Sequence, residues 1–442
     1  MAVELGWEFV KAQLPANWRG LAIERGLIRP QPPQLHTKIT DIEQVLRLVL
    51  YRIGLESSLQ VAVSTATAAR NEIAREEGEG SAQAAQLVEL SAPALHYWER
   101  KLAGYLGELL ARMLVPEGLL SPERWSGYEV VGVDGTTETC PGADGTTARV
   151  VYALRLSDLT MLGCHATDKH GTESMRIFDV HPGQLWMGDR FYANPYDIAW
   201  VVDAGADVLV RYKFKALPLY DAQGASFDVM EHLRQINEPG QMAEWPACVH
   251  PKQHTPVQGR LCAVRLPDEE AEKVRARLRN EEGSKVSAQS LETAAWLILF
   301  TTAPVERIET AKVIGLYKLR WQMELEIRRD KSLGGMDKLP NFRDDTIATW
   351  LYGKLLIQQI ARKTVSPSVA FPPSAAGIAF LPASPASGAG SREAPPPHRA
   401  RGPRDVARDG PRLPGHPRRS ASTATARPAQ RHRRLRGAHR SP

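Results

Sequence analysis

Cysteine is scarce in this sequence, and the four cysteines lie far apart. They are Cys140, Cys164, Cys248 and Cys262, with no CxxC pair among them. A disulfide scaffold, a zinc ribbon and a c-type haem site are therefore excluded at the level of motifs. The first residues, MAVELGWEFVKAQ, carry acids where a signal peptide has a basic segment before an apolar one. The longest uncharged run, 364–391, contains five prolines, which excludes a membrane helix there.

Several common catalytic motifs are also missing. The chain has no P-loop, no GxGxxG after a strand-like run, no HExxH and no GxSxG. ATP, NAD, zinc-protease and serine-hydrolase chemistry therefore lose their usual sequence signals. With 442 residues, 43% of them hydrophobic and 24% charged, the composition is that of a cytoplasmic globular protein of roughly two to three domains.

Basic charge is concentrated in the last 79 residues. From 364 to 442 the chain has 14 Arg, no Lys and three acids, a balance of +11 against +6 for the whole chain, so residues 1–363 carry −5. Overall charge therefore gives no argument for nucleic-acid binding. The segment also holds 14 of the 32 prolines, and we expect a disordered tail. It is either the product of a frameshift near codon 363 or a basic arm that contacts phosphates.

Residues 1–125 are expected to form a helical N-terminal domain. Apolar residues recur every three or four positions in Ile42–Ile53 and in Leu95–Leu114, which is the spacing of an amphipathic helix. The pattern fits a module that binds DNA ends and a plain helical bundle equally well.

Short runs of β type begin at Tyr128. Strands are expected at 128–134, 149–156, 160–167, 185–191 and 208–214, with helices near 171–177 and 195–202. Three consecutive strands followed by alternating helix and strand predict a mixed α/β sheet with helices on its faces. We assign residues 126–212 to the first part of this core.

Residues 213–305 interrupt the alternation and are expected to form a β-rich insertion. It contains strand-like runs at 261–266 and 293–302 and a charged helix near 268–279. Residues 306–363 are helical again and complete the core. Gly334 and Gly335 end one helix, and a last amphipathic helix is expected at 344–362, before the tail at 364–442.

One helical face of the segment 317–331 gathers a carboxylate, a phenol and cations. At about 100° per residue, four residues fall within an arc of about 60°: Tyr317, Arg320, Glu324 and Lys331. Such a face is either a solvated surface with i,i+4 ion pairs or part of a phosphodiester-processing site. In the second case a metal ligand stands beside cations that bind phosphates.

Two aspartates end strand-like runs, Asp134 in VVGVDGTT and Asp189 in LWMGDRF. Each is a common turn residue in that position. The ends of strands are nevertheless where α/β sheets build their sites. Two such carboxylates, with a third on a helix, are able to hold two divalent ions about 3.5–4 Å apart.

On these residues the sequence resembles the DDE transposases of bacterial insertion sequences, in particular the IS-four group marked by the YREK signature. The signature, Y-(2)-R-(3)-E-(6)-K, is matched by Tyr317, Arg320, Glu324 and Lys331. The surroundings of Asp134 and Asp189 resemble those of the family's two catalytic aspartates. The similarity extends over roughly residues 90–363. Phe191 follows the Asp-Arg pair where many relatives have glycine.

The resemblance implies an α/β fold with a ribonuclease-H-like catalytic core, broken by the β-rich insertion. It implies that Asp134, Asp189 and Glu324 hold two Mg²⁺ ions, with Mn²⁺ able to substitute. It also implies DNA contacts by six residues: Tyr317, Arg320, Lys331, Trp321, Trp296 and Arg190. For Trp296, which lies within an apolar run, core packing is the competing interpretation.

The expected function is Mg²⁺-dependent cleavage at the ends of an insertion sequence and strand transfer into target DNA. The expected partners are double-stranded DNA, as terminal inverted repeats and target, and a second copy of the chain in a homodimer on DNA. No membrane is involved, and the DNA-bound protein is expected at the bacterial nucleoid. One alternative is an inactive remnant that binds the repeats without catalysis. Another is an aspartyl-phosphate hydrolase with Asp134 as nucleophile, which leaves the helix face unexplained.

Overall fold

A computed structural model of the chain describes residues 6–28, 39–78, 87–114, 125–214, 216–282, 286–340 and 344–364. Tertiary contacts divide the chain after Pro382, and all of these residues belong to the first unit. The tail predicted for 364–442 lies outside the described residues, apart from Thr364 at the end of the last helix. Within the described ranges, no helix is both long enough and apolar enough to cross a membrane.

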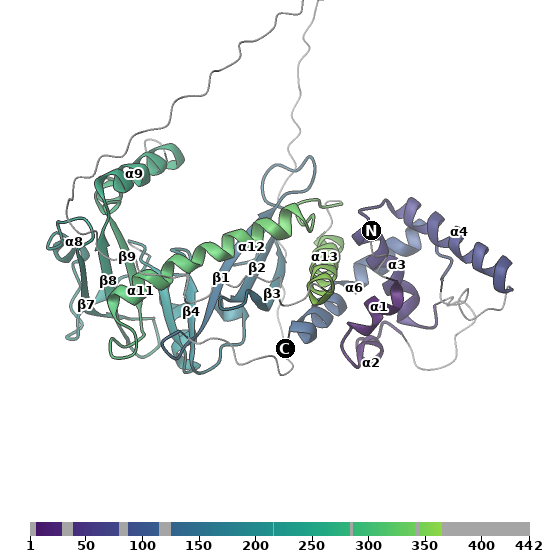
Figure 1. Cartoon of the computed structure of the whole chain (residues 1–442), viewed down its shortest axis with the longest axis horizontal. Coiled ribbons are helices and arrows are strands. Elements are labelled where there is room, and N and C mark those ends of the chain that lie inside the picture. Colours follow the sequence, from purple (N-terminus) through teal and green to yellow (C-terminus); the bar gives the residue numbers. More distant parts are fainter. Residues whose placement is uncertain are drawn as a thin grey trace, which may run out of the picture. The chain divides into compact units, whose positions relative to one another are not determined.

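One mixed sheet of nine strands occupies the middle of the chain (Figure 1). The strand order across the sheet is β3-β2-β1-β4-β5-β9-β8-β7-β6. β1, β4 and β5 run parallel, and the remaining pairs are antiparallel. The strands are β1 Glu129–Glu138, β2 Ala148–Arg155, β3 Thr160–Asp168, β4 Gln184–Gly188, β5 Asp207–Arg211, β6 Leu219–Tyr220, β7 Met242–Val249, β8 Val257–Arg265 and β9 Trp296–Thr301.

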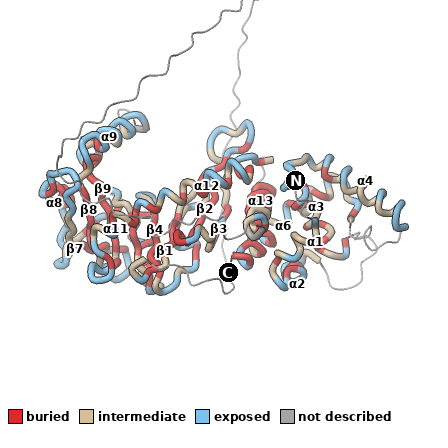
Figure 2. The backbone as a smooth tube through the Cα atoms, in the orientation of Figure 1, coloured by how far each residue is buried: buried red, intermediate tan, exposed pale blue. Residues whose placement is uncertain are grey.

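Both faces of the central strands are buried, as the red trace of β1, β2 and β4 in Figure 2 shows. On β4, Leu185 and Met187 belong to one hydrophobic cluster, whereas Trp186 between them belongs to the other. The alternation follows from the period of two along a strand. Strands covered on both faces are nearly continuous in apolar residues, which is why these runs were recognisable in the sequence.

The segment 171–177 differs from the expected helix. Only a single 3₁₀ turn, η1 (Met175–Ile177), forms there. The fully buried carboxylate of Asp197 accepts hydrogen bonds from the Ser174 hydroxyl at 2.6 Å and from the Met175 N–H at 3.3 Å. These contacts hold the segment extended against helix α7 (Pro195–Asp203), so that tertiary packing overrides the local helical pattern.

The strands of 213–305 lie in the same sheet as the core and not in a sheet of their own. β9 pairs antiparallel with β5, with Leu209 opposite Thr301, and β8, β7 and β6 follow outward. Three short or charged helices accompany them: α8 Val229–Leu233, α9 Asp268–Glu282 and α10 Ala288–Thr293.

The segment 306–340 packs back across the sheet (Figure 1). It consists of α11 (Thr310–Tyr317), a 3₁₀ turn η3 (Lys318–Arg320) and α12 (Trp321–Ser332). α12 packs closely on β1 at Gly132 of the strand and Met323 of the helix. A Cβ added to Gly132 would stand only 2.7 Å from the Met323 sulfur, so a larger residue there would displace the Met323 side chain. Alternate residues of β1 therefore face α12. The helix stop predicted at Gly334–Gly335 is confirmed, and Gly335 has φ +62°.

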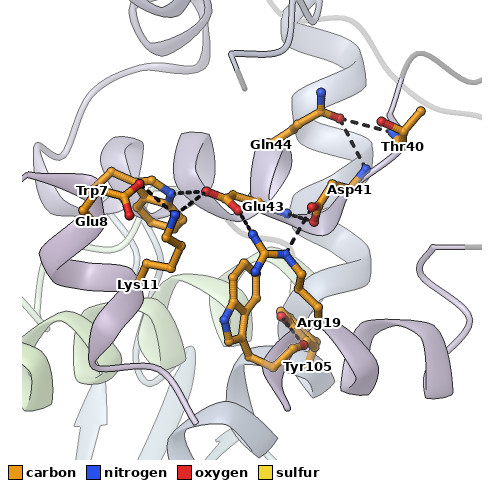
Figure 3. Close-up of polar contacts among 10 residues, drawn as sticks. Trp7, Glu8, Lys11, Arg19, Thr40, Asp41, Glu43, Gln44 and Tyr105 are labelled. Atoms are coloured by element: carbon orange, nitrogen blue, oxygen red, sulfur yellow. Dashed lines mark hydrogen bonds and ion pairs between the residues drawn. The ribbon is translucent and has the colours of Figure 1, made fainter. Parts of the chain in front are cut away.

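The helical stretches predicted in 42–53 and 95–114 are confirmed. The described N-terminal helices are α1 Trp7–Ala12, α2 Trp18–Glu24, α3 Ile42–Gly54, α4 Leu59–Glu77 and α6 Ala92–Leu114. Figure 3 shows how one carboxylate joins three of them. Glu43 on α3 accepts a 2.6 Å hydrogen bond from the Trp7 indole of α1 and forms an ion pair with Arg19 of α2. The Glu43 side chain is only 6% exposed, so these partners are needed to compensate its burial.

The last described helix, α13 (Asp344–Thr364), joins the N-terminal helices to the sheet. The Thr349 hydroxyl of α13 donates to the carbonyl oxygen of Glu99 on α6. The Ala166 N–H of β3 donates to the Tyr352 hydroxyl at 3.1 Å. The amphipathic helix predicted for 344–362 is thereby confirmed, with its buried residues facing both neighbours.

Candidate active site

Asp134 and Asp189 lie at the same edge of the sheet, on neighbouring parallel strands. β1 and β4 pair at Gly132 and Met187, and each aspartate lies two residues beyond that pair. Because side chains alternate along β1, Asp134 projects toward α12 as Gly132 does. The register of two parallel strands thus places two carboxylates at one level of the sheet, from positions 55 residues apart in the sequence.

Backbone hydrogen bonds fix the orientation of both aspartates. One oxygen of Asp134, Oδ1, accepts from the Gly135 N–H at 2.9 Å. Oδ1 of Asp189 accepts from the Phe191 N–H at 2.7 Å, and the Asp189 carbonyl accepts from the Tyr192 N–H at 3.2 Å. β4 ends at Gly188, although the sequence predicts a strand up to 191. Asp189 begins a tight turn directly after the strand.

Glu324 approaches from α12, and Arg320 joins it to β1. The Arg320 guanidinium contacts Oδ2 of Asp134 at 3.3 Å through Nη1 and donates to Oε1 of Glu324 through Nη2. The i,i+4 pair of the signature helix is therefore present, and it is not a free surface pair. It is one arm of a bridge between the helix and the sheet.

Burial raises the pKa of Asp134 to about 6. The Arg320 guanidinium and the Gly135 N–H oppose this increase, whereas the carboxylates of Asp189 and Glu324 add to it. The carboxyl of Asp134 is thus buried beside two other acids, which is the electrostatic setting that a bound cation relieves.

Two further side chains, Tyr317 and Arg211, lie near this group of acids. The Tyr317 phenol is buried, and its environment includes Arg320, Arg211, Asp189 and Asp134. Arg211, at the end of β5, was not singled out from the sequence. Its guanidinium lies near Tyr317, Arg190 and Arg320. The sequence did contain a signal for Arg211. It is the last residue of β5, the parallel strand beside β4, and site residues cluster at such strand ends.

Lys331 lies at the far end of the same helix face and is bound to the protein. Its ammonium is 3.1 Å from Oε1 of Glu138, the last residue of β1, and 3.1 Å from the Thr137 carbonyl oxygen. The Glu138 side chain is 2% exposed, and burial raises its pKa although Lys331 opposes the increase. Glu138 shares the α12-facing side of β1 with Asp134, and the sequence pattern did not reveal it.

The two predicted tryptophans have opposite environments. Trp321, at the start of α12, is 53% exposed beside Arg320. Trp296 is 8% exposed at the start of β9, and its indole N–H donates to the Ile236 carbonyl at 3.2 Å. The structure therefore places Trp296 in the core, as the competing interpretation had it, and does not bring it to the surface as a DNA contact. Arg190 is exposed directly after Asp189.

The site residues are suited to divalent cations by their chemistry. Carboxylate oxygens are the preferred ligands of Mg²⁺, and Asp134, Asp189 and Glu324 supply only such oxygens. In the described part of the chain, no group of three or more His, Cys, Asp or Glu side chains is already arranged around a metal position. The guanidinium of Arg320 holds two of the three carboxylates in the present arrangement.

The chain is similar to known transposases over most of its described length. It is 30% identical over 304 residues to the putative transposase InsL for insertion sequence element IS186A of Escherichia coli K12, covering 67% of this chain and 82% of the relative. It is equally similar to the transposase for element IS421 of Escherichia coli, covering 81% of that protein. The transposase for element IS231F of Bacillus thuringiensis subsp. israelensis is 28% identical over 205 residues, or 42% of each chain.

Two other comparisons add nothing to this result. No model of a protein family matches the chain. Among solved structures, the piggyBac transposase synaptic complex with hairpin DNA matches 80% of this chain and 73% of that chain, with a TM-score of 0.35 and 7% identity. That likeness is too low to carry an argument. The sequence relatives suffice, and the chain belongs to the family of bacterial insertion-sequence transposases that includes those of IS186 and IS421.

Proposed function

We propose that this transposase cleaves the ends of its insertion sequence and joins them to target DNA by a DDE mechanism, with Asp134, Asp189 and Glu324 as ligands of two Mg²⁺ ions. The observation that carries the proposal is the meeting of these three carboxylates. Two come from parallel neighbouring strands in register and one from the helix packed over them. Mn²⁺ is expected to substitute for Mg²⁺.

A ribonuclease-H-like core is part of the same proposal. The mixed sheet carries Asp134 on β1, and Asp189 follows directly after β4. Along the sequence, strands β6 to β9 come after the core strands and before the helix that carries Glu324. This order of elements is the one that the resemblance implied. We further propose that residues 1–125 contribute to binding the DNA ends and that two copies act together as a homodimer on DNA.

When bound, two Mg²⁺ ions supply charge stabilisation at the attacking and leaving oxygens of an in-line displacement at phosphorus. The protein's own part is to hold the carboxylate oxygens and to bind the phosphates on either side. We expect contacts with these phosphates from the three signature residues Tyr317, Arg320 and Lys331, and from Arg211, which lies beside Tyr317 and Arg320. Trp321, half exposed at the rim, offers a flat face on which an unpaired base can stack.

The test uses DNA that flanks the gene. Sequencing both sides should reveal terminal inverted repeats, and duplexes of these ends should be cut by the purified full chain in Mg²⁺ and left intact in EDTA. Binding of the ends without any cutting would identify the non-catalytic remnant. Absence of both binding and cutting, with an intact reading frame through codon 363, would contradict the proposed function.

Arg190→Ala is expected to weaken binding of the DNA ends and to lower its salt dependence. Arg190 is exposed beside Asp189, and within the described residues its side chain makes no ion pair that would have to break. Loss of one phosphate contact reduces the slope of log K against log salt by about 0.9. Fluorescence anisotropy at five salt concentrations measures the slope. The exposed Arg279→Ala, on α9, is the matched control, and equal slopes in both variants would exclude Arg190 as a contact.

A further inference from the structure

Arg320 spans two of the three carboxylates of the proposed site. Nη1 contacts Asp134 on β1 at 3.3 Å, and Nη2 donates to Glu324 on α12. The Arg320 side chain is 21% exposed, so most of its partners are protein groups. A planar guanidinium with several N–H donors is suited to such a bridge, whereas an ammonium is not.

On Asp134, Arg320 contacts the oxygen that the backbone leaves open. Oδ1 of Asp134 is taken by the Gly135 N–H at 2.9 Å, which leaves Oδ2, and this atom faces Arg320. On Glu324, Oε1 accepts the hydrogen bond from Nη2 of Arg320. A divalent ion held by Asp134 and Glu324 would bring two positive charges beside the guanidinium, so the ion and the guanidinium compete for the same pair of carboxylates.

The backbone at Arg320 is a junction between two helices. Residues 318–320 form the 3₁₀ turn η3, which separates α11 from α12 and ends at Arg320. The helical spacing predicts one α-helix over 317–331, which is wrong, because η3 interrupts it before α12 begins at Trp321. A short 3₁₀ stretch between α-helices is a frequent place for a hinge. The charged or titratable groups around the guanidinium are Asp134, Glu324, Tyr317 and Arg211.

We propose that in the DNA-free protein Arg320 occupies the cation position between Asp134 and Glu324 and competes there with the divalent ion. This inference rests on the proposed function, because it assumes that these carboxylates are the metal ligands. A DNA phosphate offers Arg320 an alternative bidentate partner. Movement of the guanidinium to that phosphate frees the two oxygens, so that DNA binding and metal binding assist each other. The site is thereby kept from loading metal before a DNA end arrives.

Mn²⁺ binding to the full chain without DNA tests the proposal, with free Mn²⁺ followed by electron paramagnetic resonance. Arg320→Gln removes the competing cation, and its affinity for Mn²⁺ is expected to rise about tenfold over that of the unmodified protein. Arg320→Lys keeps the charge but not the fork, and an intermediate affinity is expected. Arg279→Gln on α9 is the control, because it removes the same charge from an exposed position outside the site. Its effect should stay below about twofold.

The outcomes separate this inference from the proposed function. Glu324→Gln removes a ligand, and its Mn²⁺ binding should fall at least about tenfold. If Glu324→Gln loses Mn²⁺ while Arg320→Gln binds it no better than the unmodified protein, the inference is overturned and the proposed metal site stands. If Glu324→Gln and the unmodified protein bind Mn²⁺ equally, the metal site and the inference both fail. Thermal unfolding of each variant confirms that the chain is folded.

Discussion

Glu324→Gln is expected to abolish cleavage of the DNA ends while leaving their binding within about threefold of normal. Glutamine has the shape of glutamate but lacks the negative charge that a divalent ion requires. A loss of at least about 10³-fold in the cleavage rate is expected, equivalent to ~4 kcal/mol of transition-state stabilisation. Single-turnover cleavage of a labelled end duplex measures the rate, and a gel shift in Ca²⁺ measures binding.

The control is Glu306→Gln, the same substitution at an exposed position before α11. Its cleavage rate should equal that of the unmodified protein. Asp134→Asn should resemble Glu324→Gln, because both residues contribute to one group of interacting charges. Normal cutting by Glu324→Gln would remove this residue from the catalytic site and with it the DDE assignment.

Arg362→Ala is expected to lower the free energy of unfolding by about 2–4 kcal/mol. Arg362, near the end of α13, forms ion pairs with Glu326 and with Asp330, the latter at 3.1 Å, both on the side of α12 away from the site. The side chains of these two acids are only 4% and 3% exposed. Without Arg362, the buried Asp330 loses this ion pair, and Glu326 keeps the contact with the exposed Arg329. This expected loss of unfolding free energy is smaller than for a fully buried ion pair, because the Arg362 side chain is 34% exposed to solvent. Urea or thermal unfolding measures the loss.

The pH dependence of this variant gives a second check. Burial raises the pKa of Asp330 to about 7 from an unfolded value of 3.8. A carboxyl whose pKa is raised by folding contributes stability below its unfolded pKa and loses it as the pH rises through the folded value. The loss of unfolding free energy in Arg362→Ala, relative to the unmodified protein, should therefore be larger at pH 8 than at pH 5.

Arg329→Ala is the matched control for Arg362→Ala. Arg329 also contacts Glu326, at 3.1 Å, but its side chain is 54% exposed and its pair is a surface i,i+3 contact. A change below about 0.5 kcal/mol is expected. Equal destabilisation by the two substitutions would show that Arg362 is not a specific link between α13 and α12.

The positions of the main helices and strands could be predicted because their patterns are local. Runs buried on both faces predicted β1, β2 and β4, and a period of three to four predicted α3, α6 and α13. The failures have tertiary causes. The expected helix at 171–177 is held extended by Asp197 from a later helix. The expected continuous helix at 317–331 is interrupted by η3, where the chain passes from the outer strands to β1.

The sequence by itself determined which residues are candidates, since strand ends, helical spacing and the resemblance to a transposase family together singled out Asp134, Asp189 and Glu324. Only the tertiary structure decided what each side chain contacts. It placed Trp296 in the core, brought Arg211 to the site, paired Lys331 with Glu138 and set Arg320 between two carboxylates. The physical reason is that helical and strand periods act between neighbours in the chain. The contacts Trp296–Ile236, Arg320–Asp134 and Lys331–Glu138 instead join residues 60, 186 and 193 positions apart.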